Sequence, residues 1–240
     1  MCIRLAYFSP KEETKVEDIF KFHVDVHAPH IMQTVSEVAS SGLQKYLIGR
    51  ITSESIGKSS FSNYVQMWWN DEAAMNRYLE ELKNRKLPDG NFQSGPQGEL
   101  GLQVNWHCTA FVEEEVIFEN KLTRDTAAIR LGVYKPKEGI SIDEAFKSHI
   151  QTHSPAIMKL ISEVATPGLN RYVVGKVTEV AKGEPLFTNY VKMWWEDIDS
   201  MNRYLQALEA RWPLPGDDFS TKVDWGFTAF VNDEVVFQKE

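Results

Sequence analysis

The chain has 240 residues and a formal net charge of −8; 42% of its residues are hydrophobic, 25% charged and 12% aromatic. This composition is typical of a globular protein and excludes a disordered chain, while the acidic balance without a basic stripe argues against nucleic acid as a partner. No stretch is long enough for a membrane span and no cleavage-site pattern follows the N-terminus, so we expect a cytoplasmic protein without membrane contact.

Periodicity predicts six elements in the first half of the chain. They are a strand at 2–8, a helix at 16–39, strands at 43–52 and 61–69, a helix at 71–86 and a last strand at 103–112. The stretch 88–102 begins with many glycine and proline residues, which predicts a surface loop and a candidate lid.

Most of the first half recurs 126 residues later. Met75-Asn76-Arg77-Tyr78-Leu79, for example, returns as Met201-Asn202-Arg203-Tyr204-Leu205. The offset falls to 119 at Trp106 and Trp225, so the first copy carries seven extra residues between 87 and 104. We therefore predict an internal duplication with domains at 1–119 and 127–240, joined by a polar linker.

The order β-α-β-β-α-β is that of a ferredoxin-like unit, which has helices on only one face of its sheet. The other face must be covered, and two units in one chain can cover each other. We predict an α+β fold of two ferredoxin-like repeats packed sheet to sheet, as an intramolecular dimeric α+β barrel with a pseudo-two-fold axis. The sequence leaves open whether this pseudo-dimer is a monomer or forms a further homo-oligomer.

Each predicted first helix carries two histidines four residues apart, which puts both rings on one side of the helix. The pairs are His23 with His27 and His149 with His153, and both fall on the apolar side of their helix. A buried neutral imidazole can act as a general base near neutral pH. The alternative is a structural role, in which a ring bonds a backbone carbonyl and fixes the helix to the sheet. His30 adds a third histidine to the first half only.

Aromatic side chains recur at matching strand positions, where they could line a flat apolar pocket. Packing in the core is the alternative. His107 is predicted to lie on the strand face opposite Trp106 and Cys108, towards the interface between the sheets. The candidate substrate-binding residues are Tyr46, Tyr64, Trp68, Trp106, His107, Tyr172, Tyr190 and Trp194.

Histidines at this spacing suit zinc or iron, but Val24 stands where an HExxH motif requires glutamate, and no third ligand is fixed. Cys2 and Cys108 do not correspond between the halves, so neither a disulfide framework nor a thiolate site is indicated. We predict no metal and no cofactor, with a metal or haem protein as the alternative.

The run Lys21-Phe22-His23-Val24-Asp25-Val26-His27-Ala28-Pro29 in a βαββαβ unit resembles the EthD family of the dimeric α+β barrel superfamily. The resemblance covers both halves, although the second departs with His153-Ser154-Pro155. In that superfamily two units normally pair as a homodimer, and relatives include cyclases, decarboxylases, dehydratases and oxygenases that use no cofactor.

The resemblance implies an enzyme that acts on a small hydrophobic, aromatic or polyketide-like metabolite by histidine acid–base catalysis, as a lyase or cyclase. The candidate catalytic residues are His23, His27, His30, His149 and His153. The alternatives are a cofactor-free oxygenase of the same substrate class and a non-catalytic small-molecule carrier.

Overall fold

The structure is a computed structural model that describes residues 1–39, 42–84, 96–120, 126–165 and 168–239. Its elements follow the same order in each half of the chain. The first half contains β1 (Cys2–Pro10), α1 (Val16–Phe22), a π-helical turn η1 (His23–His27), α2 (Ala28–Val38), β2 (Leu43–Ile56), β3 (Asn63–Trp69), α3 (Glu72–Asn84), α4 (Pro96–Gln103) and β4 (Val104–Glu119). The second contains β5 (Ala128–Pro136), α5 (Ile142–Ser148), a π-helical turn η2 (His149–His153), α6 (Ser154–Val164), β6 (Leu169–Gly183), β7 (Asn189–Trp195), α7 (Ile198–Arg211), α8 (Phe219–Lys222) and β8 (Val223–Gln238).

The predicted strands and helices of the first half are present, with several differences in their extent. The helix predicted at 16–39 contains the π-helical turn η1, and the strand predicted at 43–52 runs to Ile56 and pairs with β8. The last strand runs to Glu119 instead of 112, because its second part pairs with the other half of the chain. The predicted loop at 88–102 is helical from Pro96 onwards, while 85–95 lie outside the described residues. The predicted linker also falls largely outside them, at 121–125.

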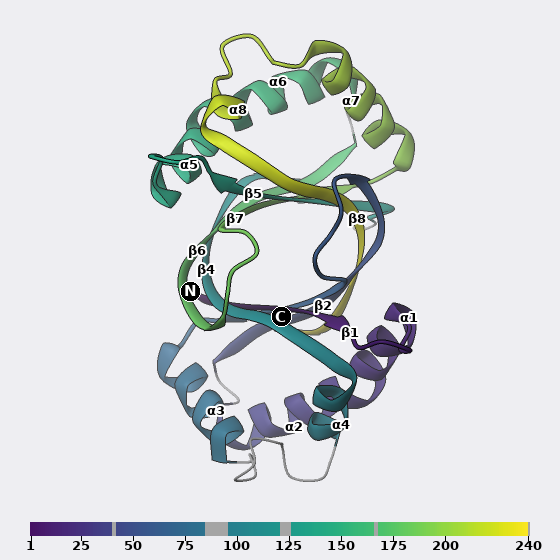
Figure 1. Ribbon diagram of the computed structural model, residues 1–240, viewed down its shortest axis with the longest axis vertical. Helices are drawn as coiled ribbons and strands as arrows, with labels where there is room; N and C mark the ends of the chain where they lie inside the picture. Colours follow the sequence, from purple (N-terminus) through teal and green to yellow (C-terminus); the bar gives the residue numbers. More distant parts are fainter. Residues whose placement is uncertain (40–41, 85–95, 121–125, 166–167, 240) are drawn as a thin grey trace.

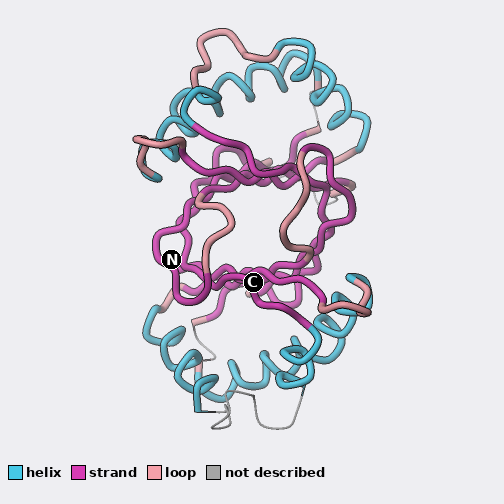
Figure 2. The backbone as a smooth tube through the Cα atoms, in the orientation of Figure 1, coloured by secondary structure: helices cyan, strands magenta, loops and turns pink. Residues whose placement is uncertain are grey.

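All eight strands form one closed antiparallel barrel, in the order β1-β3-β2-β8-β5-β7-β6-β4. The sheets of the two halves are therefore joined at their edges, through β2 with β8 and β4 with β6, and are not two separate sheets stacked face to face. Closure leaves none of the described strands with an unpaired edge. The helices cover the barrel from outside, those of the first half below it and those of the second half above it (Figures 1 and 2).

Strand alternation divides the buried side chains into two kinds of core. Trp68 points into the barrel, whereas its neighbour Trp69 packs under the helices of the first half. Trp194 and Trp195 divide in the same way in the second half. The histidine-bearing helices thus lie on the outer face of the barrel, so that any site they form is separated from the barrel interior by the sheet.

Aromatic rings fill one part of the barrel interior. The ring of Tyr7 lies 4.9 Å from that of Phe61 and 5.1 Å from that of Phe187, measured between centroids. The cavity that remains beside them has a volume of about 20 Å³. A space of this size holds roughly one water molecule, so this cavity does not accept a metabolite of aromatic size as it stands.

Two tyrosines connect the halves across the barrel. The hydroxyl of Tyr64 donates a hydrogen bond to Asp233, and that of Tyr190 donates one to Glu114 at 2.6 Å. Each ring lies directly against a glycine of the neighbouring strand, Gly49 or Gly175, where a Cβ atom would come within 2.1–2.2 Å of the ring. Glycine is required at both positions because any side chain would push the phenol away from its partner.

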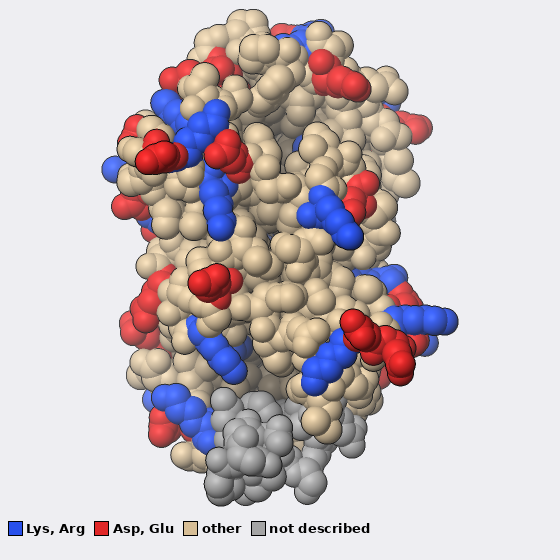
Figure 3. All heavy atoms as spheres, in the orientation of Figure 1, with Lys and Arg blue, Asp and Glu red and all other residues tan. Residues whose placement is uncertain are grey.

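Acidic and basic side chains are interspersed over the face shown in Figure 3, without a continuous stripe of either sign. Within the described residues, no helix combines the length and the apolar character that a membrane crossing requires.

Candidate functional site

The histidine pairs lie in the π-helical turns, η1 and η2. In each turn the first residue after the second histidine donates its N–H to the carbonyl of the first histidine, five residues back. A proline follows at Pro29 and at Pro155, where the missing N–H falls in the first turn of the next helix and is tolerated. The wider turn therefore lets the helix continue past the proline.

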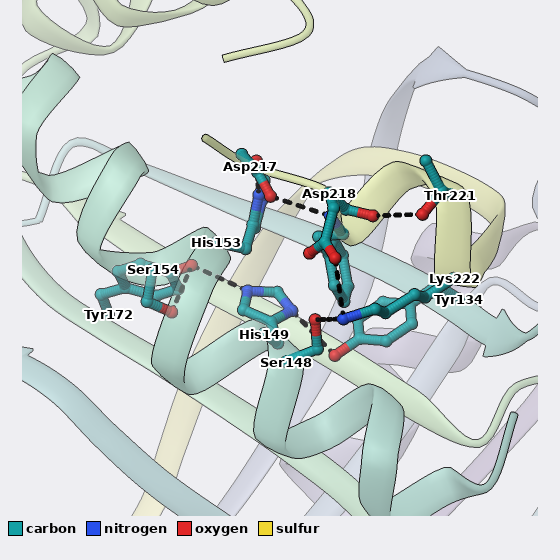
Figure 4. A network of polar contacts seen from close by, with 11 residues as sticks. Tyr134, Ser148, His149, His153, Ser154, Tyr172, Asp217, Asp218, Thr221 and Lys222 are labelled. Carbon is teal, nitrogen blue, oxygen red and sulfur yellow. Dashed lines mark hydrogen bonds and ion pairs between the residues drawn. The ribbon is translucent and has the colours of Figure 1, made fainter. Parts of the chain in front are cut away.

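All four histidines are buried, as the apolar helix face predicted. The two rings of each pair meet edge to face, with centroids 4.8 Å apart. They point at the outer face of the barrel sheet, and Figure 4 shows the second pair between helix and strands. The histidines therefore lie in the layer between the helices and the sheet.

His149 is held by hydroxyl groups at both ring nitrogens (Figure 4). Nδ1 lies 2.8 Å from the hydroxyl of Tyr134, and Nε2 lies 2.8 Å from that of Tyr172. Ser154 donates a further hydrogen bond to Tyr172 at 3.1 Å. Burial and the nearby charge of His153 lower the pKa of His149 well below its usual value, so the ring is neutral near pH 7. With both nitrogens engaged, His149 orients its surroundings and has no atom left for a substrate.

His153 has a different set of partners. Its Nδ1 lies 2.6 Å from Oδ2 of Asp217, while Oδ1 of Asp217 accepts the backbone N–H of Phe219 at 3.0 Å. No described residue forms a hydrogen bond with Nε2 of His153, and the side chain keeps a trace of exposure, with 5% of its surface accessible. One nitrogen is therefore oriented by a carboxylate and the other is available as a base.

Burial alone would raise the pKa of Asp217. The hydrogen bond and charge of His153, the N–H of Phe219 and the nearby Lys222 outweigh burial and lower this pKa below its usual value. Asp217 is thus ionised at neutral pH and stabilises a proton on His153.

Aromatic rings surround His153 on two sides. Phe219 stacks on it at 4.7 Å with an interplanar angle of 25°, and Trp212 meets it nearly at right angles at 5.8 Å. Trp212 is 40% exposed. An aromatic ring at the surface directly beside the base offers a contact for a flat apolar substrate.

The first half has other residues at some of these positions. Nε2 of His23 contacts the hydroxyl of Tyr46 at 3.0 Å, but its Nδ1 is buried and has no hydrogen-bond partner. Phe8 stands at the position of Tyr134, and Ala28 at that of Ser154. Burial, followed by the charge of His27, lowers the pKa of His23 well below its usual value. At the offset of 119, the sequence has Gly98 where the second half has Asp217.

The predicted substrate-binding residues do not form one pocket. Tyr46 and Tyr172 bind the histidines outside the barrel, whereas Tyr64, Trp68, Tyr190 and Trp194 lie inside it. The sheet separates the two groups because alternate residues of a strand face opposite sides.

Trp106 and Cys108 do not share a strand face as predicted. A register shift opposite Tyr7 and Phe8 adds a residue to β4, so that Cys108 enters the barrel core while Trp106 packs on Phe8 outside, with centroids 4.6 Å apart. A β-bulge has this effect on side-chain alternation.

The two remaining histidines, His30 and His107, belong to the first half of the chain. His107 is partly exposed and pairs with the hydroxyl of Ser9 at 2.9 Å. His30 is partly exposed, and its ring makes no hydrogen bond with a described residue. The structure therefore does not bring either of them to His153.

Sequence reasoning missed Asp217 and Tyr134. The available signal was a difference between the copies, because each stands at a position where the first half has another residue. A search for matching residues passes over such positions. Among the described residues there is no group of three or more histidine, cysteine or acidic side chains that could hold a metal ion.

We expect Tyr134→Phe to lower the free energy of unfolding by about 1–3 kcal/mol, because Nδ1 of His149 would be buried without a partner. Phe8→Tyr is the matched reverse change, since it offers a hydroxyl to Nδ1 of His23, and should raise the free energy of unfolding. Urea unfolding followed by tryptophan fluorescence measures both. Equal stability of Tyr134→Phe and the wild type would show that the contact contributes nothing.

Comparison with known proteins supports the fold and not an activity. No family model matches the sequence, and no curated protein matches it. A solved structure described as an anthrone oxidase-like protein has 16% identity and a TM-score of 0.50, over 100% of this chain and 94% of that one. A putative chlorite dismutase has 11% identity and a TM-score of 0.49, over 98% and 94% of the two chains. A chlorite dismutase from Candidatus Nitrospira defluvii has 9% identity and the same TM-score, over 98% and 92%.

The chain has a mixed α and β fold with an eight-stranded antiparallel barrel. At 16% identity, the likeness to the anthrone oxidase-like protein extends to the fold alone. The resemblance to EthD and the internal duplication stay predictions from the sequence.

Proposed function

We propose that the chain is a small-molecule enzyme in which His153 of the second half is the general base and Asp217 orients it. The observation that carries this proposal is the 2.6 Å contact between Nδ1 of His153 and Asp217, combined with an Nε2 that no described residue engages. A carboxylate in this position holds the proton on Nδ1 and leaves the lone pair of Nε2 free.

In the proposed reaction, Nε2 of His153 removes a proton from an activated carbon or a phenol of the substrate. Asp217 then stabilises the imidazolium through the existing hydrogen bond, and the proton returns to another atom of the substrate or leaves to water. His149 supports the base from its edge and keeps it in place. The exposed indole of Trp212 supports an aromatic or polyketide-like substrate.

Several finer points belong to the same proposal. The chain is a duplicated EthD-like protein with domains at 1–119 and 127–240, and it acts as a monomeric pseudo-dimer, with a further homo-oligomer as the alternative. The reaction is of the lyase or cyclase type and uses no cofactor, with a cofactor-free oxygenase as the alternative. All of these begin with the same removal of a proton, so one assay tests their common step.

The test is exchange of acidic C–H hydrogen with deuterium in D₂O, followed by proton NMR, which requires no knowledge of the final product. The panel consists of anthrone, small 1,3-diketones and acetyl-substituted phenols, with anthrone included because a protein of the same fold is described as anthrone oxidase-like. The wild type should accelerate exchange of at least one compound. His153→Ala should abolish the acceleration, and His107→Ala should retain it.

Exchange by His153→Ala at the wild-type rate would contradict the proposal. A carrier would give another pattern, in which a compound binds to both wild type and His153→Ala without exchange in either.

A further inference from the structure

Two cations stand on opposite walls of the barrel, on the side of the sheet that faces away from the histidine site. Lys45 lies near the start of β2, and Arg171 lies at the matching position of β6, 126 residues later. The strand order places β2 and β6 four strands apart in a ring of eight (Figure 1). The two residues therefore face each other across the width of the barrel.

Both side chains point inwards. The ammonium of Lys45 lies 5.4 Å from the ring centroid of Trp68, and the guanidinium of Arg171 lies 5.4 Å from that of Trp194. Trp68 belongs to the core inside the barrel and Trp194 packs against that core, and each indole is the register partner of its cation. An eight-stranded barrel is only wide enough for its inward side chains to fill. Two long cationic side chains thus share one small space.

The end of the barrel where they meet is open to water. It lies opposite the end that is filled by the rings around Tyr7, because β3 runs from the register partner of Tyr7 towards Trp69. Val116 and Val235 pair with inward-facing positions of β6 and β2 at the open end, and each is 44% exposed. Arg171 keeps 30% of its side-chain surface accessible, and Lys45 is partly exposed. An ion can reach both cations from solvent.

The two cations have few anionic partners. No carboxylate of a described residue lies within ion-pair distance of the Lys45 ammonium. Arg171 approaches Glu119, whose Oε1 is 3.7 Å from Nε, but this is too long for a hydrogen bond and Nε has no partner. At the offset of 119, the residue that corresponds to Glu119 is Gln238, the neutral register partner of Lys45.

The charges deeper in the barrel are engaged with other groups. Nζ of Lys192 lies 2.6 Å from Oδ2 of Asp233. Glu114 accepts hydrogen bonds from the amide of Gln66 at 3.1 Å and from the indole of Trp68 at 3.0 Å. Asp233 and Glu114 therefore act on Lys45 only from a distance.

The titration of Lys45 agrees with this geometry. Burial, followed by the charges of Arg171 and Lys192, lowers its pKa below the usual value, against the opposing charges of Asp233 and Glu114. Lys45 thus lies next to positive charge that its surroundings do not neutralise.

We propose that the open end of the barrel binds the carboxylate of an aromatic acid between Lys45 and Arg171. A guanidinium can donate two parallel N–H groups to one carboxylate, and an ammonium can pair with the same group. The ligand would bring negative charge to the place where two positive charges meet. The two indoles and the exposed Val116 and Val235 offer apolar contact to the ring of the acid.

The experiment is a titration with benzoate, with benzyl alcohol as a neutral probe of similar shape, followed by NMR of the indole N–H groups. In the wild type, benzoate should shift the signals of Trp68 and Trp194 and leave that of Trp225, which packs outside the barrel, unchanged. Benzyl alcohol should shift neither of the first two at the same concentration.

The variants identify the groups that bind the carboxylate. Lys45→Gln and Arg171→Gln should each weaken benzoate binding by about tenfold or more, as expected for the loss of a hydrogen bond between charged groups. Lys58→Gln is the matched control, since Lys58 is an exposed lysine near the opposite end of the barrel, and it should leave the affinity unchanged.

Several outcomes would overturn the proposal. The wild type alone is sufficient for two of them, which are the absence of any benzoate-dependent shift at Trp68 and Trp194, and equal shifts with benzyl alcohol. Equal affinity of benzoate for the wild type, Lys45→Gln and Arg171→Gln would place the acid elsewhere on the protein. Shifts with inorganic phosphate but not with benzoate would exclude an aromatic acid as the ligand.

Discussion

Replacing Asp217 with asparagine is expected to slow His153-dependent proton exchange by up to roughly 10⁴-fold, the scale known for the equivalent change in a serine protease triad. Nδ1 of His153 now faces a carboxylate oxygen at 2.6 Å, which fixes the proton on that nitrogen. Asparagine can present its NH₂ group instead, which favours the tautomer with the proton on Nε2. The ring would then have no lone pair where the substrate needs one. The measurement is the initial rate of deuterium exchange in the panel described above.

Asp218→Asn is the matched control for this change. Asp218 is the next residue in the chain, is largely exposed, and pairs with Lys222 at 3.1 Å without contacting His153. Its replacement should leave the exchange rate within about twofold of the wild type, as expected for a weak surface pair. A loss as large in Asp218→Asn as in Asp217→Asn would assign the effect to the loop as a whole.

The loss of stability caused by Asp217→Asn should depend on pH. Because the folded pKa of this carboxyl is lowered, it stabilises the fold above its unfolded pKa, about 3.9. The contribution falls as pH decreases through the folded pKa. The stability difference between wild type and Asp217→Asn should therefore be full at neutral pH and shrink below about pH 4. A constant difference across this range would place the origin elsewhere.

The histidine helices were predictable because two independent patterns agree there. The apolar spacing around His23 predicts which side of the helix is buried, and the copy at His149 repeats it. Periodicity cannot indicate what a buried ring touches, since Tyr134 comes from the preceding strand and Asp217 from a loop far along the chain. The tertiary fold alone brings these partners to the histidines.

The barrel shows the same limit. The sequence indicates that each sheet has an apolar face that must be covered. The long ends of β2 and β4 close the barrel, but they are rich in glutamate and serine, which is typical of solvent-exposed hairpin ends. Their pairing with β8 and β6 joins the two sheets into one. Which aromatic residues face the barrel interior can be decided only once this closure is known. For this reason the sequence predicted one aromatic pocket, whereas the structure has one group of these residues inside the barrel and another outside it.

Lys192 was the residue that a comparison of the copies could have identified. The strand Asn63–Trp69 reads NYVQMWW, and Asn189–Trp195 reads NYVKMWW, so a single position differs. The other residues of these two strands are identical in both halves. A charged side chain at a central strand position, where its repeat has an amide, indicates a local role that packing alone does not require.

We expect Lys192→Met to lower the free energy of unfolding by about 3–5 kcal/mol, because Asp233 would lose its cation while remaining buried. Gln66→Met, at the matching position, should cost only about 1 kcal/mol, since Glu114 keeps its bonds from Tyr190 and Trp68. Urea unfolding, analysed with the same dependence of unfolding free energy on urea concentration for all variants, measures both changes.

The double variant Lys192→Met/Asp233→Asn separates charge burial from packing. Asparagine still offers an oxygen to the hydroxyl of Tyr64, so the contact between the halves persists while both charges disappear. Stability should then recover to within about 1–2 kcal/mol of the wild type, because a buried ion pair contributes little beyond its neutral replacement. The alternative outcome is that the losses of unfolding free energy in Lys192→Met and Asp233→Asn simply add in the double variant. The cost would then come from the lost packing of the Lys192 methylene groups, and the charges of the pair would contribute nothing to the stability of the barrel.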